Sequence, residues 1–207
     1  MQPNRPFRKV LIWATSFEAS LGILGWALAL LAGIPLASRL SYSLTIFGWG
    51  LIETLPLTLL LWLATKSRWE VSRKLIRTLR RTLGNLFSSI GLPGIIALSA
   101  AAGIGEEVLF RGFLQPFLGK YVPVWASVAL AGIAFGAVHW ISAAYAATAA
   151  VVGIYLGALA EIHGTIVVPI TVHAVYDVVA IWFVIHGPGS EAPALHDGES
   201  EGTFSPT

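Results

Sequence analysis

The residues most able to do chemistry are charged and imidazole side chains set inside apolar stretches. Glu106, Glu107 and Arg111 interrupt one apolar run, and His173 and Asp177 interrupt another. A charge at the centre of a membrane helix costs roughly 2.5–3.5 kcal/mol, so such side chains usually face a bundle interior or a wet cavity. These residues are therefore expected either to pair with one another or to take part in a reaction.

Spacing separates the roles of the three charges in the first run. Glu107 and Arg111 are four residues apart and share one helical face, which favours a structural ion pair. Glu106 lies about 100° around the helix from Glu107 and can face elsewhere. We therefore expect Glu106 to carry the chemistry.

Two histidines occupy comparable places in later apolar runs. His139 follows Phe135 by four residues, and His173 precedes Asp177 by four, so each pair shares a helical face. Alone, His139 fits an interfacial or hydrogen-bonded histidine. His173 alone fits a histidine oriented by its neighbouring carboxylate.

Four further ionisable residues in the apolar part have no partner evident from the sequence. Glu18 and Glu53 fall within apolar runs and are expected to be protonated or hydrogen-bonded between helices. His163, in a short turn, and His186, at a helix end, are expected on the surface.

Taken in chain order, Glu-Glu-x-x-x-Arg, Phe-x-x-x-His and His-x-x-x-Asp form a distinctive set. Together with Gly-Ile-Tyr-Leu-Gly at 153–157 and Val-Pro-Ile at 168–170, they make residues 92–185 resemble the CPBP family of CAAX proteases and bacteriocin-processing enzymes, also called Abi. The resemblance implies an intramembrane endopeptidase of the CaaX-processing type. Its substrate would be a membrane-anchored protein or peptide, with or without a prenyl group.

The resemblance also implies a role for each motif residue. Glu106 and His139 would activate the water that attacks the peptide bond, while His173 and residue 177 would stabilise the tetrahedral intermediate. Asp177 departs from the asparagine often found at this place, and an ionised carboxylate cannot donate a hydrogen bond. The supporting residues would be Glu107, Arg111 and Phe135.

A single site requires Glu106, His139 and His173 to meet although they lie on different helices. At 1.5 Å per residue, Glu106 and His173 fall about 20 Å from one membrane face, whereas His139 falls near the end of its helix. A tilted or broken helix, or a deep cavity, is expected to reconcile these depths.

Other functions fit the same residues. Glu106, His139 and His173 could supply three ligands to Zn²⁺ and leave a fourth position for water, although we favour a mechanism without metal or other cofactor. Intramembrane glutamate and histidine also occur in proton-coupled transporters. A third alternative is a non-catalytic membrane scaffold or immunity protein.

The elements that must position these residues are apolar helices. The 207-residue chain is 56% hydrophobic and 12% charged, whereas soluble domains average about 25% charged residues. It lacks cysteine, which excludes disulfides and thiolate catalysis. We predict an all-α polytopic membrane protein with a bundle over residues 1–186, one amphipathic interfacial helix at 66–85, and a disordered acidic tail at 187–207. Six transmembrane helices are predicted at 10–34, 43–65, 91–118, 123–140, 143–161 and 165–185.

Basic residues predict the orientation of this multi-pass protein. Seven of the thirteen Lys and Arg residues fall between Lys66 and Arg81, and Arg5, Arg8 and Lys9 precede the first apolar run. Basic loops beside membrane helices are typically cytoplasmic, so both termini are predicted to be cytoplasmic. The amphipathic helix is expected to lie on the anionic bilayer surface, with lipid rather than nucleic acid as its partner.

Overall fold

The regular elements of the chain are helices throughout the part that the structure describes. This computed structural model describes residues 5–87 and 90–186, and the predicted acidic tail at 187–207 lies outside them. The predicted all-α architecture is confirmed for the described residues. In chain order the elements are α1 (Arg5–Leu31), the 3₁₀-helix η1 (Leu36–Arg39), α2 (Leu44–Lys66), α3 (Glu70–Phe87), α4 (Gly91–Glu107), the π-helix η2 (Val108–Leu114), α5 (Gln115–Leu118), α6 (Val124–Val138), α7 (Ala143–His163) and α8 (Val167–His186).

Four of these segments are long and apolar enough to cross a membrane. They are Arg8–Leu31, Leu44–Lys66, Gly91–Leu118 and Ala143–His163. Two further apolar helices, α6 and the Val167–Phe183 part of α8, are shorter than the roughly 20 residues that a full span needs. Four of the six predicted spans are thus supported by length and composition, and the other two remain a prediction.

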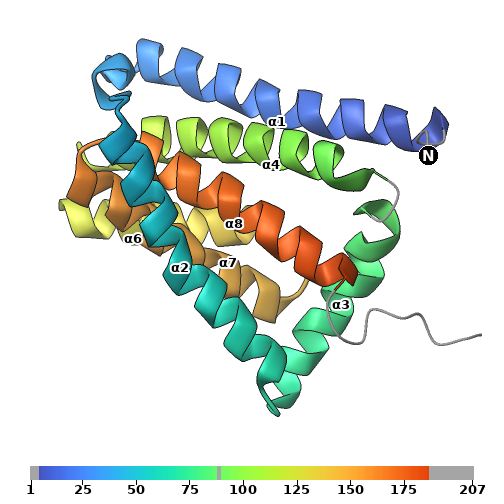
Figure 1. Cartoon of the computed structure of the whole chain (residues 1–207). Helices are drawn as coiled ribbons and strands as arrows, with labels where there is room; N and C mark the ends of the chain where they lie inside the picture. The colour runs from blue at the N-terminus through green and yellow to red at the C-terminus, as the bar shows by residue number, and fades with distance from the viewer. Residues whose placement is uncertain (1–4, 88–89, 187–207) are drawn as a thin grey trace, which may run out of the picture.

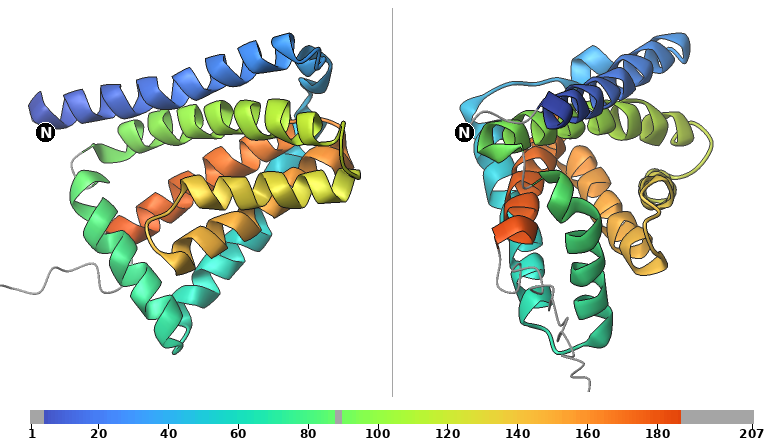
Figure 2. Two further views of the ribbon diagram at one scale, coloured as in Figure 1. Left: turned by 180° about the vertical axis from the view of Figure 1, so that it is seen from behind. Right: turned by 90° about the vertical axis from the view of Figure 1, so that its right-hand side faces the viewer.

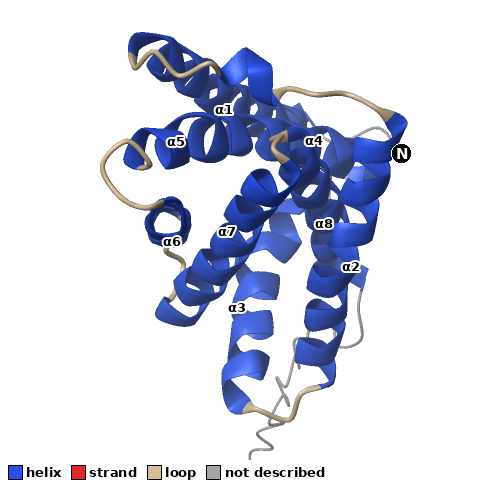
Figure 3. Cartoon of the chain, turned by 90° about the vertical axis from the view of Figure 1, so that its left-hand side faces the viewer, coloured by secondary structure: helices blue, strands red, loops and turns tan. Residues whose placement is uncertain are grey.

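The helices pack so that α4 and α8 lie at the centre of the bundle. Figure 1 shows α1 along one side of α4 and α8 along its other side, with α2 crossing α8. In Figures 2 and 3, α6 and α7 form a pair on the remaining side, and α7 contacts α8. The two helices that carry Glu106 and His173 are therefore enclosed by the others.

Local sequence signals fix several helix ends. The hydroxyls of Ser43 and Ser142 each accept a backbone N–H from three residues further on, at 3.1 and 3.2 Å, and so cap α2 and α7. Gly164 ends α7 in the left-handed conformation, with φ of 62°, that glycine adopts without strain. Pro123 directly precedes α6.

The predicted amphipathic helix forms as α3 and packs against α8 and α2. It links the end of α2 to the region before α4, as Figure 1 shows on the side opposite η1. Its basic residues Arg73, Lys74 and Arg77 are exposed, while Leu75 and Ile76 are half-buried against the bundle. Its predicted position on a bilayer surface remains a prediction.

The outer helices present large apolar side chains outward. Trp13 on α1 is 76% exposed, and Leu44 at the start of α2 is 92% exposed. Water would penalise such a surface, whereas lipid would not. Together with the apolar spans, this surface is that of an integral membrane protein.

Candidate active site

Three of the predicted catalytic side chains meet at one place. Glu106 comes from the last turn of α4, His139 from the residue that follows α6, and His173 from α8. A carboxylate oxygen of Glu106 lies 3.5 Å from Nε2 of His139 and 3.9 Å from Nε2 of His173. The convergence predicted from the sequence is therefore confirmed.

The shortness of α6 explains how His139 reaches the depth of Glu106. Glu106 precedes the end of its helical segment at Leu118 by 12 residues, which is about 18 Å at 1.5 Å per residue. His139 follows the first residue of α6, Val124, by 15 residues, or about 22 Å. Measured from the loop that joins these helices, the two side chains are at similar depth. The short length of α6 therefore accounts for the depth of His139.

The orientation of His139 follows from its own helix. Its Nδ1 lies 2.7 Å from the carbonyl oxygen of Phe135, and since a carbonyl only accepts, Nδ1–H is the donor. This assigns Nε2 as the nitrogen that faces Glu106. The ring of Phe135 stacks on His139 at 4.4 Å and meets His173 edge-on at 5.8 Å, which holds both imidazoles in place.

A buried ion pair orients the second histidine. Arg111 donates from Nη1 to a carboxylate oxygen of Glu107 at 2.7 Å, and both side chains are fully buried. The same Glu107 oxygen accepts a hydrogen bond from Nδ1 of His173 at 2.9 Å. The predicted pair is confirmed, but Glu107 does more than neutralise Arg111, because it also turns Nε2 of His173 toward Glu106. The sequence did not predict that second contact.

A cavity of about 120 Å³ lies in front of Glu106 and the two histidines. Asp177 lines it, with a carboxylate oxygen 3.6 Å from Nε2 of His173. Tyr145 and Tyr176 also line it, and sequence reasoning missed both. The available signal was a phenol within an apolar segment, and in one case its position directly before Asp177.

The Gly-Ile-Tyr-Leu-Gly stretch supports the site from α7. Arg111 donates from Nη2 to the carbonyl of Gly153 at 2.6 Å, and Gln115 donates to the carbonyl of Gly157 at 3.1 Å. A Cβ on Gly153 would lie 3.0 Å from the backbone of Gly132 on α6, so a side chain there would force the two helices apart. Gln115, which is fully buried, is a supporting residue that the sequence did not reveal.

A second polar cluster lies apart from this cavity, between α2 and α7. Tyr155 donates to a carboxylate oxygen of Glu53 at 2.9 Å, which confirms the expected hydrogen bond between helices. His163 was predicted to be a surface residue, and this is wrong. Its Nε2 is buried 3.7 Å from the other Glu53 oxygen, and its ring lies against Trp49 at 5.6 Å. The neighbouring α2, which carries Glu53 and Trp49, covers it.

The remaining predicted residues stay outside the cavity lining. His186 is exposed at the end of α8, as expected. One carboxylate oxygen of Glu18 on α1 is buried and makes no hydrogen bond to any described group. Within residues 5–87 and 90–186, no group of three or more His, Asp or Glu side chains is placed so that it could hold a metal ion.

The arrangement suits activation of a small molecule such as water. Two imidazole nitrogens and one carboxylate oxygen face one another beside a cavity, and the Glu106 oxygen makes no hydrogen bond within the described part of the chain. A carboxylate with spare acceptor capacity can take a proton from water, and an imidazole can hold or return it. The geometry therefore fits hydrolysis by general acid–base catalysis.

Comparison with known proteins finds a family model that matches the part of the chain that holds this site. The family model described as type II CAAX prenyl endopeptidase Rce1-like matches residues 87–179. This segment resembles the Rce1-like family. The match covers most of the stretch from α4 to α8, including every residue that lines the cavity except Leu57 on α2, and it agrees with the resemblance found in the sequence. No curated protein and no solved structure matches the chain.

The Rce1-like assignment supports an intramembrane protease of the CAAX type. The matched segment starts at the end of α3 and leaves α1 and α2 outside. The matched segment is thus the part of the chain that holds the buried charged residues Glu106, Glu107 and Arg111.

Proposed function

We propose that this protein is an intramembrane endopeptidase that hydrolyses a peptide bond with a water activated by Glu106 and His139. One observation carries the proposal: a buried carboxylate oxygen without a hydrogen-bond partner in the described residues lies within 4 Å of two oriented imidazole nitrogens. The Rce1-like family supports the same reaction class.

The roles divide between the two sides of the cavity. Glu106 takes a proton from water, whose oxygen attacks the carbonyl carbon of the scissile bond, and His139 shares that proton and returns it to the leaving amine. His173 donates Nδ1–H to Glu107 and, protonated at both nitrogens, donates Nε2–H to the oxyanion of the tetrahedral intermediate. Asp177 assists only in its protonated form, because an ionised carboxylate has no hydrogen to donate.

The substrate is a membrane-anchored protein or peptide that enters from the lipid phase or its surface. The family description names prenylated CAAX substrates, and a prenyl group would hold a C-terminal segment at the bilayer. The cavity of about 120 Å³ has room for the reacting peptide group and a water rather than for a folded domain. The cleaved segment must therefore be extended.

The test is cleavage by the purified full chain in liposomes. Two reporter peptides of one sequence are compared, one prenylated at its CaaX cysteine and one anchored by a single apolar helix. Cleavage of either supports the endopeptidase, and the faster one defines the anchor. Cleavage of neither, while the protein stays folded, contradicts the proposal.

Metal dependence is measured in the same assay. We propose catalysis without metal, so prolonged chelation should leave the cleavage rate unchanged and elemental analysis should find no stoichiometric zinc. Loss of cleavage on chelation, restored by Zn²⁺ alone, would instead make Glu106, His139 and His173 ligands.

A further inference from the structure

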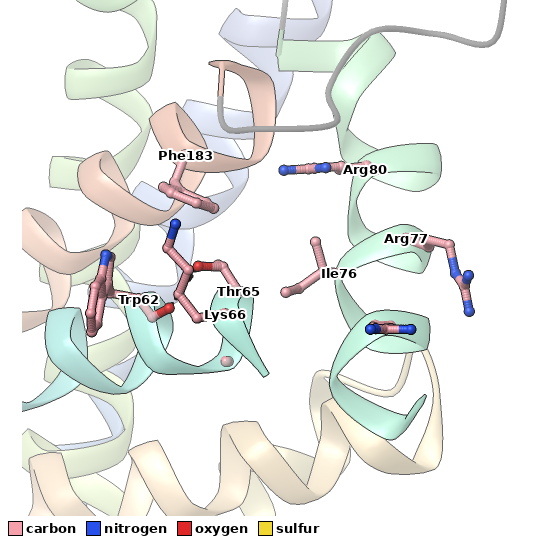
Figure 4. Close-up of a pocket in the computed structure, with 9 residues that line it drawn as sticks. Trp62, Thr65, Lys66, Ile76, Arg77, Arg80 and Phe183 are labelled. Atoms are coloured by element: carbon pink, nitrogen blue, oxygen red, sulfur yellow. Dashed lines mark hydrogen bonds between the residues drawn. The ribbon is translucent and has the colours of Figure 1, made fainter. Parts of the chain in front are cut away.

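A second cavity lies far along the bundle from Glu106, where the end of α2, the middle of α3 and the end of α8 come together. Its volume is about 390 Å³, within the usual range for small-ligand sites. Figure 4 shows Lys66 beside Phe183 on one side and Arg80 extending from α3 toward them across the opening. Three helices distant in sequence thus build one pocket.

The pocket is strongly basic. Lys66, Arg73, Arg77 and Arg80 line it, and no acidic side chain is among its described lining residues. In Figure 4 the guanidinium of Arg77 points away from the opening, on the far side of α3, whereas that of Arg80 points toward it. Positive charges gathered beside one cavity repel each other and attract an anion.

These cations lack the partners that other arginines in the bundle have. Arg39 pairs with Glu161 at 2.8 Å and Arg111 pairs with Glu107, whereas none of the basic residues of this pocket pairs with a described carboxylate. The Nε atom of Arg80 is buried and has no hydrogen-bond partner in the described part of the chain. A buried donor without an acceptor is costly, and an anionic ligand in the pocket would supply one.

The other wall of the pocket is apolar. Trp62, Ile76 and Phe183 line it, and two of them lie near the ends of the apolar helices α2 and α8. A ligand that fills the pocket therefore needs an anionic head beside an apolar part. Phospholipids have this character, and their phosphates lie at the depth where membrane helices end.

We propose that this pocket binds the phosphate headgroup of an anionic phospholipid, with an acyl chain against Trp62 and Phe183. Arg80 and Lys66 contact the phosphate, and Arg73 and Arg77 add to its attraction at the rim. The bound lipid joins α2 and α3 to α8, the helix that carries His173 and Asp177. The site is independent of the proposed protease reaction.

The test measures thermal unfolding of the purified full chain in neutral detergent during titration with phosphatidylglycerol or phosphatidylcholine. We expect phosphatidylglycerol to raise Tm with a saturable dependence and phosphatidylcholine to have little effect. The K66Q/R80Q variant should bind phosphatidylglycerol about tenfold or more weakly, because two cations at the headgroup are lost.

The matched control is K74Q/R81Q, which removes the same charge from exposed positions outside the pocket lining. It should keep the affinity of the unsubstituted chain within about twofold. Equal responses to both lipids, or an equal loss in the control variant, would overturn the proposal. So would a full Tm rise with inorganic phosphate alone, which would identify a free anion as the ligand.

The acidic segment 187–207 is the competing occupant from the chain itself. If this segment filled the pocket, phosphatidylglycerol would not raise the Tm of the full chain but would raise the Tm of a chain ending at His186. That result would also overturn the proposal. The comparison of the two lipids on the unsubstituted chain decides the matter even if K66Q/R80Q does not fold.

Discussion

The part of the chain from α4 to α8 and the part from α1 to α3 differ in the burial and the partners of their charged residues. In the segment that combines α4, η2 and α5, half of the apolar window is buried, against 11% in α1 and 17% in α2. Glu106, Glu107 and Arg111 lie in the buried segment and are joined to α7 and α8 by hydrogen bonds and ion pairs. In α3 the charges instead gather around a pocket without acidic partners.

This difference shows which part of the chain holds the reactive centre. A buried charge in lipid is tolerated only with a partner or a function, so the positions of such charges mark the reactive centre. The Rce1-like match, at residues 87–179, covers this region and not α1 or α2. The first helices instead provide lipid-facing surface and a basic end.

The largest effect that would test this contrast is expected from Glu106→Gln. The substitution keeps the size of the side chain but removes the base, so cleavage should fall by about 10²–10⁴-fold, with a comparable loss in His139→Ala. Glu53→Gln on α2 is the matched control, because Glu53 is also within an apolar helix but does not line the cavity. Reporter cleavage in liposomes measures both. A fully active Glu106→Gln enzyme would refute the assignment.

Arg111→Ala should give the largest loss of stability. It leaves Glu107 charged and buried without its arginine partner, with only the hydrogen bond from His173, at a cost of about 3–5 kcal/mol. The double variant with Glu107→Gln should be milder. Arg39→Ala removes a partly exposed pair with Glu161 and should cost about 1 kcal/mol or less. Denaturant unfolding in micelles compares them. An equal loss in the free energy of unfolding from Arg111→Ala and Arg39→Ala would mean that the buried ion pair contributes no more to stability than the partly exposed one.

A smaller effect is expected at Asp177. Asp177→Asn supplies a permanent donor beside His173, so cleavage should stay within about tenfold of the unsubstituted chain. Asp177→Ala removes the polar group and should cost up to about 10²-fold, as for a lost oxyanion donor. Steady-state cleavage rates decide between them. Equal rates in both variants would leave Asp177 with no role in stabilising the intermediate.

The orientation of the two regions is tested without any change in rate. Reporter fusions at Ser72 in α3 and after residue 207 should both report the cytoplasm, because the basic residues of α3 favour that side. An extracytoplasmic signal at either position would reverse the predicted topology.

The sequence predicted helices well because apolar runs and capping residues are local. The second helix was predicted at 43–65 and forms at Leu44–Lys66, and the helix predicted at 143–161 forms at Ala143–His163. The π-helix η2 was not predicted, since nothing in its apolar sequence distinguishes wider winding from α-helix. Such segments often occur beside functional residues, as η2 does here.

The sequence predicted which site residues share a face of one helix, but not which residues of different helices are in contact. Spacing showed that Glu107 and Arg111 share a face, but not that Glu107 also contacts His173, since that depends on how α4 and α8 are rotated against each other. The same limit hid the contact of Glu53 with His163. Gln115 was missed because placing an uncharged amide in an apolar helix costs less free energy than placing a charge there, so its position did not indicate a special role.

The early end of α6 has a consequence for the lipid around the protein. Its 15 residues cover about 22 Å, whereas the hydrocarbon core of a bilayer is about 30 Å thick. If α6 crosses the bilayer as predicted, a helix this short draws the headgroups of the nearer leaflet inward, because leaving its end in hydrocarbon would cost more than thinning the membrane. His139 directly follows that end. We then expect a thinner bilayer beside α6, which would shorten the path that water must travel to Glu106.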